Sequence, residues 1–142
     1  MEANIICSGA LFYSTSTKRF MFLQRTSEKT KGTWGLVGGT MKYTESAFDG
    51  LKREIKEEVG ATPKFKKVIP LEMFTSNDEK FFFHTYLIAI ETEFLPKLND
   101  EDSGYCWCAF ECWPKNLHMG LKNTLNNKAI KGKLQTILDL IT

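Results

Sequence analysis

The sequence lacks several features that mark specialised classes of protein. No apolar run approaches the roughly 20 residues of a membrane-spanning helix, so we expect no membrane association. The formal net charge is only +2, which is too small by itself to indicate a nucleic acid or a membrane as partner. There are only two histidines, His84 and His118, and neither has a second ligand at metal-binding spacing.

Cysteine is also sparse, with four residues in a chain of 142. The chain is large enough, and at 42% hydrophobic residues apolar enough, to form a core without disulfides. Cys106, Cys108 and Cys112 lie close together, but no second CxxC pair or paired histidine accompanies them, which argues against a zinc site. We therefore expect reduced cysteines, a cytoplasmic location and one domain over residues 1–142.

Strand-like and helix-like patterns alternate along the chain. Apolar, β-branched and aromatic runs bounded by turn residues predict strands at 4–14, 20–25, 33–39, 64–76, 80–92 and 104–112. Helical periodicity predicts helices at 44–59, 121–127 and 127–141. Strands before, between and after helices indicate an α+β fold in which helices cover both faces of a mixed sheet.

The predicted helix at 44–59 has an acidic edge. A rotation of about 100° per residue places Ala47, Leu51 and Val59 on one apolar face. Glu54, Glu57 and Glu58 fall along one border of that face. Crowded carboxylates repel one another unless a cation lies among them, and Mg²⁺ and Mn²⁺ prefer such hard oxygen ligands. A solvated acidic face is the alternative that the helix alone leaves open.

The spacing around this helix forms a longer motif. Gly39 is followed after five residues by Glu45 and, after seven more, by the run 53–61, which reads REIKEEVGA. This pattern resembles the signature of the Nudix hydrolase superfamily over residues 39–61. Many relatives have proline where this chain has Val37, a change that keeps an extended backbone preference. The resemblance implies a Nudix-type α/β/α sandwich with a mixed β-sheet between helices.

The resemblance also implies roles for individual residues. Glu45 and Arg53 match a pair that braces the loop against the helix. The positions that bind metal, or lie with their backbone close to it, correspond here to Gly39, Glu54, Glu57 and Glu58. The implied reaction is hydrolysis, with Mg²⁺ or Mn²⁺, of a pyrophosphate bond in a nucleoside diphosphate linked to another group.

The general base varies within this family, and the sequence leaves it open. Glu57 is the first candidate, because Glu54 and Glu58 look like the firmer metal ligands; Glu54 nevertheless also belongs to the catalytic set. The alternatives are Glu101 and Asp102, which lie on a later acidic loop where relatives often bring a carboxylate to the metals.

Substrate contacts are less sharply indicated. Arg25 ends a predicted strand where relatives often place a basic residue against phosphate, although a surface cation is the alternative. Trp34 is a candidate to stack on a base or sugar, although it is also a candidate packing residue. The aromatic residues Phe74 and 81–83 are interpreted as core, with one of them a candidate to be exposed towards the base. The short chain favours a small nucleotide such as a (d)NTP or an ADP-ribose-like compound.

Two other functions remain as hypotheses, and a homodimer is left open. An enzyme acting on RNA 5′ ends, by pyrophosphate removal or decapping, would need a basic groove, and only the stretch TPKFKKV at 62–68 is locally basic. A non-catalytic nucleotide-binding sensor would be expected to lose box glutamates, and this chain retains all of them.

Overall fold

The computed structural model describes residues 4–141, and a mixed sheet of seven strands forms its centre. The strands are β1 (Ile5–Ser14), β2 (Arg19–Arg25), β3 (Trp34–Gly35), β4 (Val37–Thr40), β5 (Lys67–Thr75), β6 (Phe81–Ile90) and β7 (Asp102–Ala109). The helices are α1 (Ala47–Val59), α2 (Met119–Asn126) and α3 (Lys128–Ile141). Every element predicted from the sequence is present, and the extended piece at 33–39 is divided into β3 and β4.

The strand order explains why the sheet is mixed. The main path runs β3-β2-β1-β6-β5, while β4 pairs with β1 and β7 pairs with β2. The pairing of β1 with β6 is parallel, and the other strand pairs are antiparallel. The strand that precedes α1, β4, is therefore held against the central strand β1, so the motif lies over the middle of the sheet.

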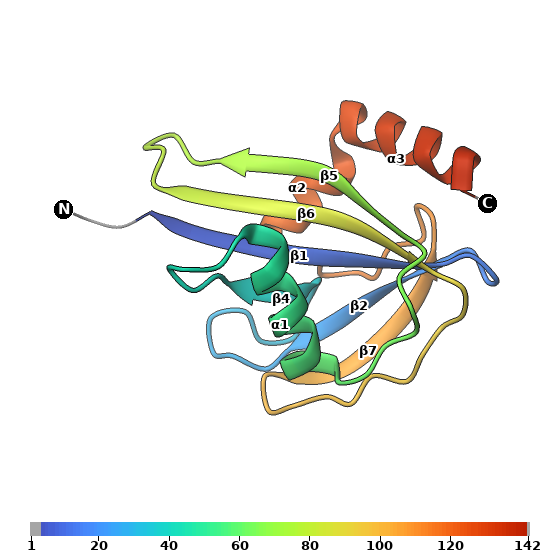
Figure 1. Ribbon diagram of the computed structural model, residues 1–142, viewed down its shortest axis with the longest axis horizontal. Helices are drawn as coiled ribbons and strands as arrows, with labels where there is room; N and C mark the ends of the chain where they lie inside the picture. Colours follow the sequence, from blue (N-terminus) through green and yellow to red (C-terminus); the bar gives the residue numbers. More distant parts are fainter. Residues whose placement is uncertain (1–3, 142) are drawn as a thin grey trace.

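Alternating side chains of β1 divide the core into two layers. Ala10 and Phe12 belong to a buried cluster with Leu51 and Ile55 of α1. Leu11 and Tyr13 point to the opposite face, where buried residues of α2 and α3 join them, namely Leu121, Leu125 and Leu134. Figure 1 shows α1 on one side of the strands and the two C-terminal helices at the other, which confirms the α/β/α arrangement. Within residues 4–141, no helix is both long enough and apolar enough to cross a membrane.

Helix α1 is shorter at its start than the predicted 44–59. It begins after Ser46, whose side chain accepts a hydrogen bond from Asp49 N at 3.1 Å, and it ends at Gly60, whose φ of 79° suits glycine. A Cβ on Gly50 would lie 3.0 Å from Glu45 Oε1 and closer still to Met41. Gly50 therefore makes room for the loop that precedes the helix, and not for the glutamates one turn later.

Candidate active site

Arg53 connects the acidic helix to the loop before it. Its Nε donates to Glu45 Oε2 at 2.7 Å, its Nη2 donates to Glu45 Oε1 at 2.9 Å, and Nη2 also reaches Thr40 O at 3.3 Å. Glu45 Oε1 accepts a further bond from Lys42 N at 2.7 Å. The Arg53 guanidinium and the Lys42 amide hold the pKa of Glu45 at about 2. The structure thus brings together the two residues that were predicted to brace the loop.

The same guanidinium separates two of the three clustered glutamates. Arg53 Nη1 lies 3.0 Å from Glu54 Oε1 and 3.1 Å from Glu57 Oε2. Burial raises the pKa of Glu54, and the negative charges of Glu57 and Glu101 add to this effect while Arg53 opposes it. Arg53 therefore relieves part of the repulsion along the acidic edge, and an excess of negative charge remains around Glu54.

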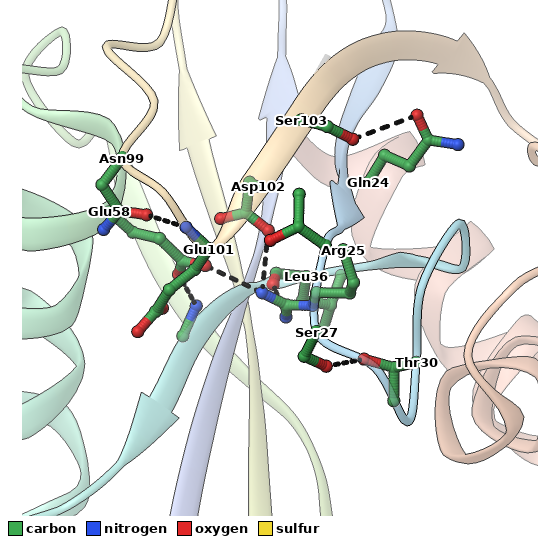
Figure 2. A network of polar contacts seen from close by, with 12 residues as sticks. Gln24, Arg25, Ser27, Thr30, Leu36, Glu58, Asn99, Glu101, Asp102 and Ser103 are labelled. Carbon is green, nitrogen blue, oxygen red and sulfur yellow. Dashed lines mark hydrogen bonds and ion pairs between the residues drawn. The ribbon is translucent and has the colours of Figure 1, made fainter.

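Glu58 points inward from α1 and is 1% exposed. Its Oε2 accepts a hydrogen bond from Arg25 Nη1 at 2.8 Å, and its Oε1 accepts one from Gly38 N at 2.8 Å. Figure 2 shows Arg25 reaching between Glu58 and the Asp102 carboxyl group, which Nη1 also contacts at 3.2 Å. Burial, reinforced by contact with Asp102, raises the pKa of Glu58 to about 9.

Asp102 belongs to the same buried cluster as Glu58 and Arg25. Asp102 is 5% exposed, and its Oδ2 has no hydrogen-bond donor within residues 4–141. Burial and the neighbouring Asp102 carboxyl group both disfavour ionisation of Glu58, whereas the Arg25 guanidinium favours it. Asp102 is therefore engaged with Arg25 and Glu58 and is not free in the site.

Arg25 is held more firmly than a surface cation would be. Besides its two carboxylate partners, its Nη2 donates to Leu36 O at 2.6 Å. A Cβ on Gly35 would lie 3.1 Å from Arg25 Nε, so the guanidinium passes closely over β3. Arg25 lines the cavity described below, and its contact with substrate phosphate stays a prediction.

The loop before β7 carries the other candidate base. Asn99 ties this loop to α1, because its Nδ2 donates to Glu57 O at 3.1 Å. Its Oδ1 accepts from Glu101 N at 2.9 Å (Figure 2). Glu101 is exposed, and its charge acts on Glu54, so the two carboxylates lie within electrostatic range. Asn99 was not identified from the sequence, where it reads as an ordinary turn residue.

The residues of the box fit a hard divalent cation by their chemistry. Glu54 and Glu57 offer carboxylate oxygens one helical turn apart, and the Glu57 side chain is 55% exposed. A Cβ on Gly39 would lie 2.7 Å from Glu54 Cδ, so any side chain at this position of β4 would displace the Glu54 carboxylate. Within residues 4–141, no three His, Cys, Asp or Glu side chains are arranged to hold a metal ion. A cation would therefore compete with Arg53 for Glu54 and Glu57.

A cavity of about 580 Å³ opens between the sheet and α2. At one end it meets the glycine-rich strand of the box, and at the other it meets aromatic side chains of β5 and β6. The lining residues are Cys7, Ser8, Gly9, Arg25, Thr30, Gly35, Leu36, Gly38, Gly39, Thr40, Glu72, Phe74, Phe81, Phe83, Thr85, His118, Gly120, Leu121, Asn123, Thr124 and Asn127. The cavity therefore joins the predicted metal-binding segment to an apolar pocket.

The structure corrects the interpretation of these aromatic residues as core with one member exposed, because three of them line the cavity. Phe74 is 51% exposed, and Phe81 and Phe83 are only partly buried; all three line the cavity. They lie at the end of β5 and the start of β6 and face a cavity instead of packed side chains, which sequence periodicity cannot reveal. Trp34 does not line the cavity but packs against the cluster beneath α2 and α3, so its contact with substrate stays a prediction.

Comparison with known proteins places these features in a family. The family model described as NUDIX domain matches residues 6–127. No curated protein matches the chain. The chain resembles the crystal structure of a MutT NUDIX hydrolase from Burkholderia pseudomallei, with a TM-score of 0.72 and 22% identity over 89% of this chain and 99% of that one.

Two further solved structures carry ligand information in their descriptions. An Ap4A hydrolase binary complex from C. elegans gives a TM-score of 0.69 at 18% identity over 92% of this chain and 97% of that one. The NUDIX domain of Shewanella oneidensis NrtR, complexed with ADP ribose, gives a TM-score of 0.62 at 16% identity over 77% of this chain and 75% of that one. At these identities the structures support the fold, and the family match covers most of the sequence. The chain belongs to the Nudix hydrolase family, whose enzymes act on pyrophosphate bonds.

Proposed function

We propose that this protein hydrolyses the pyrophosphate bond of a small nucleotide, with Mg²⁺ or Mn²⁺ as cofactor. The observation that carries the proposal is the continuity of one cavity from the Gly38–Thr40 strand to the rings of Phe74 and Phe81. A volume of about 580 Å³ lies within the range of small-ligand sites. The glycine end suits phosphates near the glutamates, and the aromatic end suits a base.

Three glutamates would hold the metal, in different ways. When bound, the ion would neutralise phosphate oxygens and lower the pKa of a water nucleophile. Glu54 and Glu57 lie on the accessible edge of α1, next to Gly39 and Arg53. Glu58 accepts hydrogen bonds from Arg25 and from the Gly38 amide. It therefore positions the β4 backbone at Gly38 as well as offering a carboxylate oxygen to a metal ion.

Glu57 is our first choice for the base that accepts the water proton. It is exposed, and its charged contact among residues 4–141 is with Arg53, so its carboxylate can turn towards a substrate. Glu101 is the second choice, because it is exposed and its charge reaches Glu54. Asp102 is a weaker candidate, since it is buried and bonded to Arg25.

The lining disfavours a long RNA substrate. Among the lining residues within the described chain, Arg25 is the one arginine or lysine, and it is already bonded to two carboxyl groups. A track for successive phosphates would need several unengaged cations. The intact set of box glutamates likewise favours an enzyme over a non-catalytic sensor. The four free cysteines agree with the cytoplasmic location that we propose.

A substrate panel tests this function. Purified protein with Mg²⁺ or Mn²⁺ is incubated with nucleoside triphosphates, nucleotide sugars and 5′-triphosphorylated RNA, together with the Ap4A and ADP-ribose that two similar structures suggest. We expect pyrophosphate cleavage of at least one small nucleotide and its loss in Glu57→Gln. Cleavage of RNA alone would overturn the proposed substrate class, and no cleavage of any compound would overturn the proposed activity.

A further inference from the structure

A β-bulge in strand β5 changes which face of the sheet Glu72 occupies. The register of β5 with β6 pairs Pro70 with Tyr86 and then Glu72 with Thr85, so β5 contains one extra residue at this point. Without the extra residue, position 71 would face Thr85 and position 72 would point to the opposite side. The bulge therefore turns Glu72 to the cavity side, next to the buried Leu71.

Helix α3 holds this irregular backbone in place. Lys133 Nζ donates to Pro70 O at 2.9 Å and to Leu71 O at 3.0 Å. These contacts give hydrogen-bond partners to carbonyl groups at the interruption of the ladder. Bulges that redirect a side chain are frequent beside functional sites. The position of Glu72 thus depends on the bulge in β5 and on the hydrogen bonds that Lys133 of α3 donates to it.

Glu72 brings a carboxylate into the aromatic end of the cavity. It lies in register with Thr85 and two residues before Phe74, which pairs with Phe83. Its Oε1 accepts a hydrogen bond from Thr124 Oγ1 at 2.6 Å, and within residues 4–141 no lysine or arginine forms an ion pair with it. The remaining lone pairs of the carboxylate are available to a ligand.

We propose that Glu72 selects guanine as the base of the substrate. This inference rests on the proposed nucleotide hydrolase function and names the class of base that the site takes. A carboxylate has two acceptor oxygens side by side and pairs best with two adjacent donors. The Watson–Crick edge of guanine presents two adjacent donors, N1–H and the 2-amino group.

The other bases place an acceptor against the carboxylate. Adenine and cytosine offer one amino group beside an acceptor ring nitrogen, and uracil offers one N–H between two carbonyl oxygens. Each would bring a lone pair towards a negatively charged oxygen, which is a repulsive element that rejects the wrong ligand. Hypoxanthine keeps N1–H but lacks the 2-amino group, so it should lose one of the two hydrogen bonds.

The aromatic walls supply the stacking surface that such a base needs. The ring centroid of Phe81 lies 6.4 Å from that of Phe74 and 6.5 Å from that of Phe83. A Cβ on Gly9 would lie 3.1 Å from Phe83 Cε1, so this ring packs directly over the backbone of β1. Stacking against these rings is open to every base, and the discrimination falls to Glu72.

The test measures binding separately from hydrolysis. Isothermal titration calorimetry of the wild-type protein with GMP, dGMP, IMP, AMP, CMP and UMP gives a ranking of bases that does not require turnover. We expect GMP and dGMP to bind with similar affinity and about 10-fold or more tightly than IMP, with the others weaker still. Glu72→Gln should remove the preference for GMP over IMP, because an amide offers one acceptor only. Its size and its hydrogen bond from Thr124 are retained, so the fold should persist.

Glu79→Gln is the matched control, since it removes the same charge from the exposed turn between β5 and β6. It should keep the wild-type ranking. Equal binding of AMP and GMP, a ranking set by ribose instead of base, or an unchanged ranking in Glu72→Gln would overturn the inference. The substrate panel separates the two proposals: turnover without base preference leaves the hydrolase function standing, and base preference without turnover leaves only the binding assignment.

Discussion

Two parallel hydrogen bonds join Arg53 to Glu45, from Nε to Oε2 at 2.7 Å and from Nη2 to Oε1 at 2.9 Å. The remaining nitrogen of the guanidinium contacts Glu54 and Glu57. One side chain thus fixes the loop before α1 and sets the charge balance of the acidic edge. Bidentate pairs of this kind define orientation as well as adding stability.

Arg53→Ala should therefore lower both stability and rate. Loss of the pair frees the loop at 42–46 and leaves the glutamates without their shared cation, so we expect a lower melting temperature and a fall in kcat of about 10- to 100-fold. Arg19→Ala is the matched control, because Arg19 forms an equivalent two-bond contact with Glu93 away from the cavity. An unchanged melting temperature with only a higher KM would instead make Arg53 a substrate contact.

Acid should weaken the same pair. Arg53 and Lys42 lower the pKa of Glu45 from 4.5 to about 2, so the folded protein binds fewer protons here than the unfolded chain. The contribution of Glu45 to stability is therefore complete above pH 4.5 and is lost as the pH falls towards about 2. Thermal melts across this range should show a shallower pH dependence for Glu45→Gln than for the parent. The exposed Glu28→Gln should retain the parental slope, and identical slopes for all three proteins would refute the assignment.

Motif spacing and periodicity predicted the parts of this protein that local sequence determines. The helix carrying Glu54 and the two-sided sheet follow from patterns within a few residues. The bracing pair follows from the family resemblance that the motif carries. The start of α1 differs by three residues, because Glu45 serves the loop and Ser46 caps the helix. Such competition between a cap and a longer helix depends on contacts that the chain makes only when folded.

The rest depended on contacts between distant segments. The approach of Arg25 to Glu58 and Asp102 joins three elements, and nothing in the sequence fixes their distance. The bulge at Glu72 is defined by the register of β5 with β6, which the sequence does not give. The exposure of Phe74 depends on which parts of the sheet the helices cover. Apolar residues at a cavity edge have the same local pattern as core residues, so the cavity could not be predicted.

Metal dependence follows from the hard oxygens of the box. We expect activity with Mg²⁺ or Mn²⁺, its loss after exhaustive EDTA treatment, and no restoration by Zn²⁺. A divalent ion that binds only the folded state, at about 100 times its Kd, should raise the melting temperature by about 5–10 °C. Differential scanning calorimetry with and without Mg²⁺ measures this shift. Full turnover in EDTA would exclude a metal-assisted reaction.

Glu57→Gln gives the sharpest test of the acidic edge. The amide keeps the size of the side chain and can still accept from Arg53 Nη1, now 3.1 Å from Glu57 Oε2, but it removes one of the clustered charges. We expect the rate to fall by orders of magnitude, because both charge compensation of the metal and a candidate base are lost. Without metal, the melting temperature should equal or exceed that of the parent, since repulsion with Glu54 is relieved. Mg²⁺ should raise the melting temperature of the variant by less than it raises that of the parent.

Asp49→Asn, on the solvent side of α1, removes an equal charge and should change neither turnover nor the response to Mg²⁺. Turnover in Glu57→Gln equal to that of the parent would show that the acidic edge is a solvated surface and that catalysis lies elsewhere.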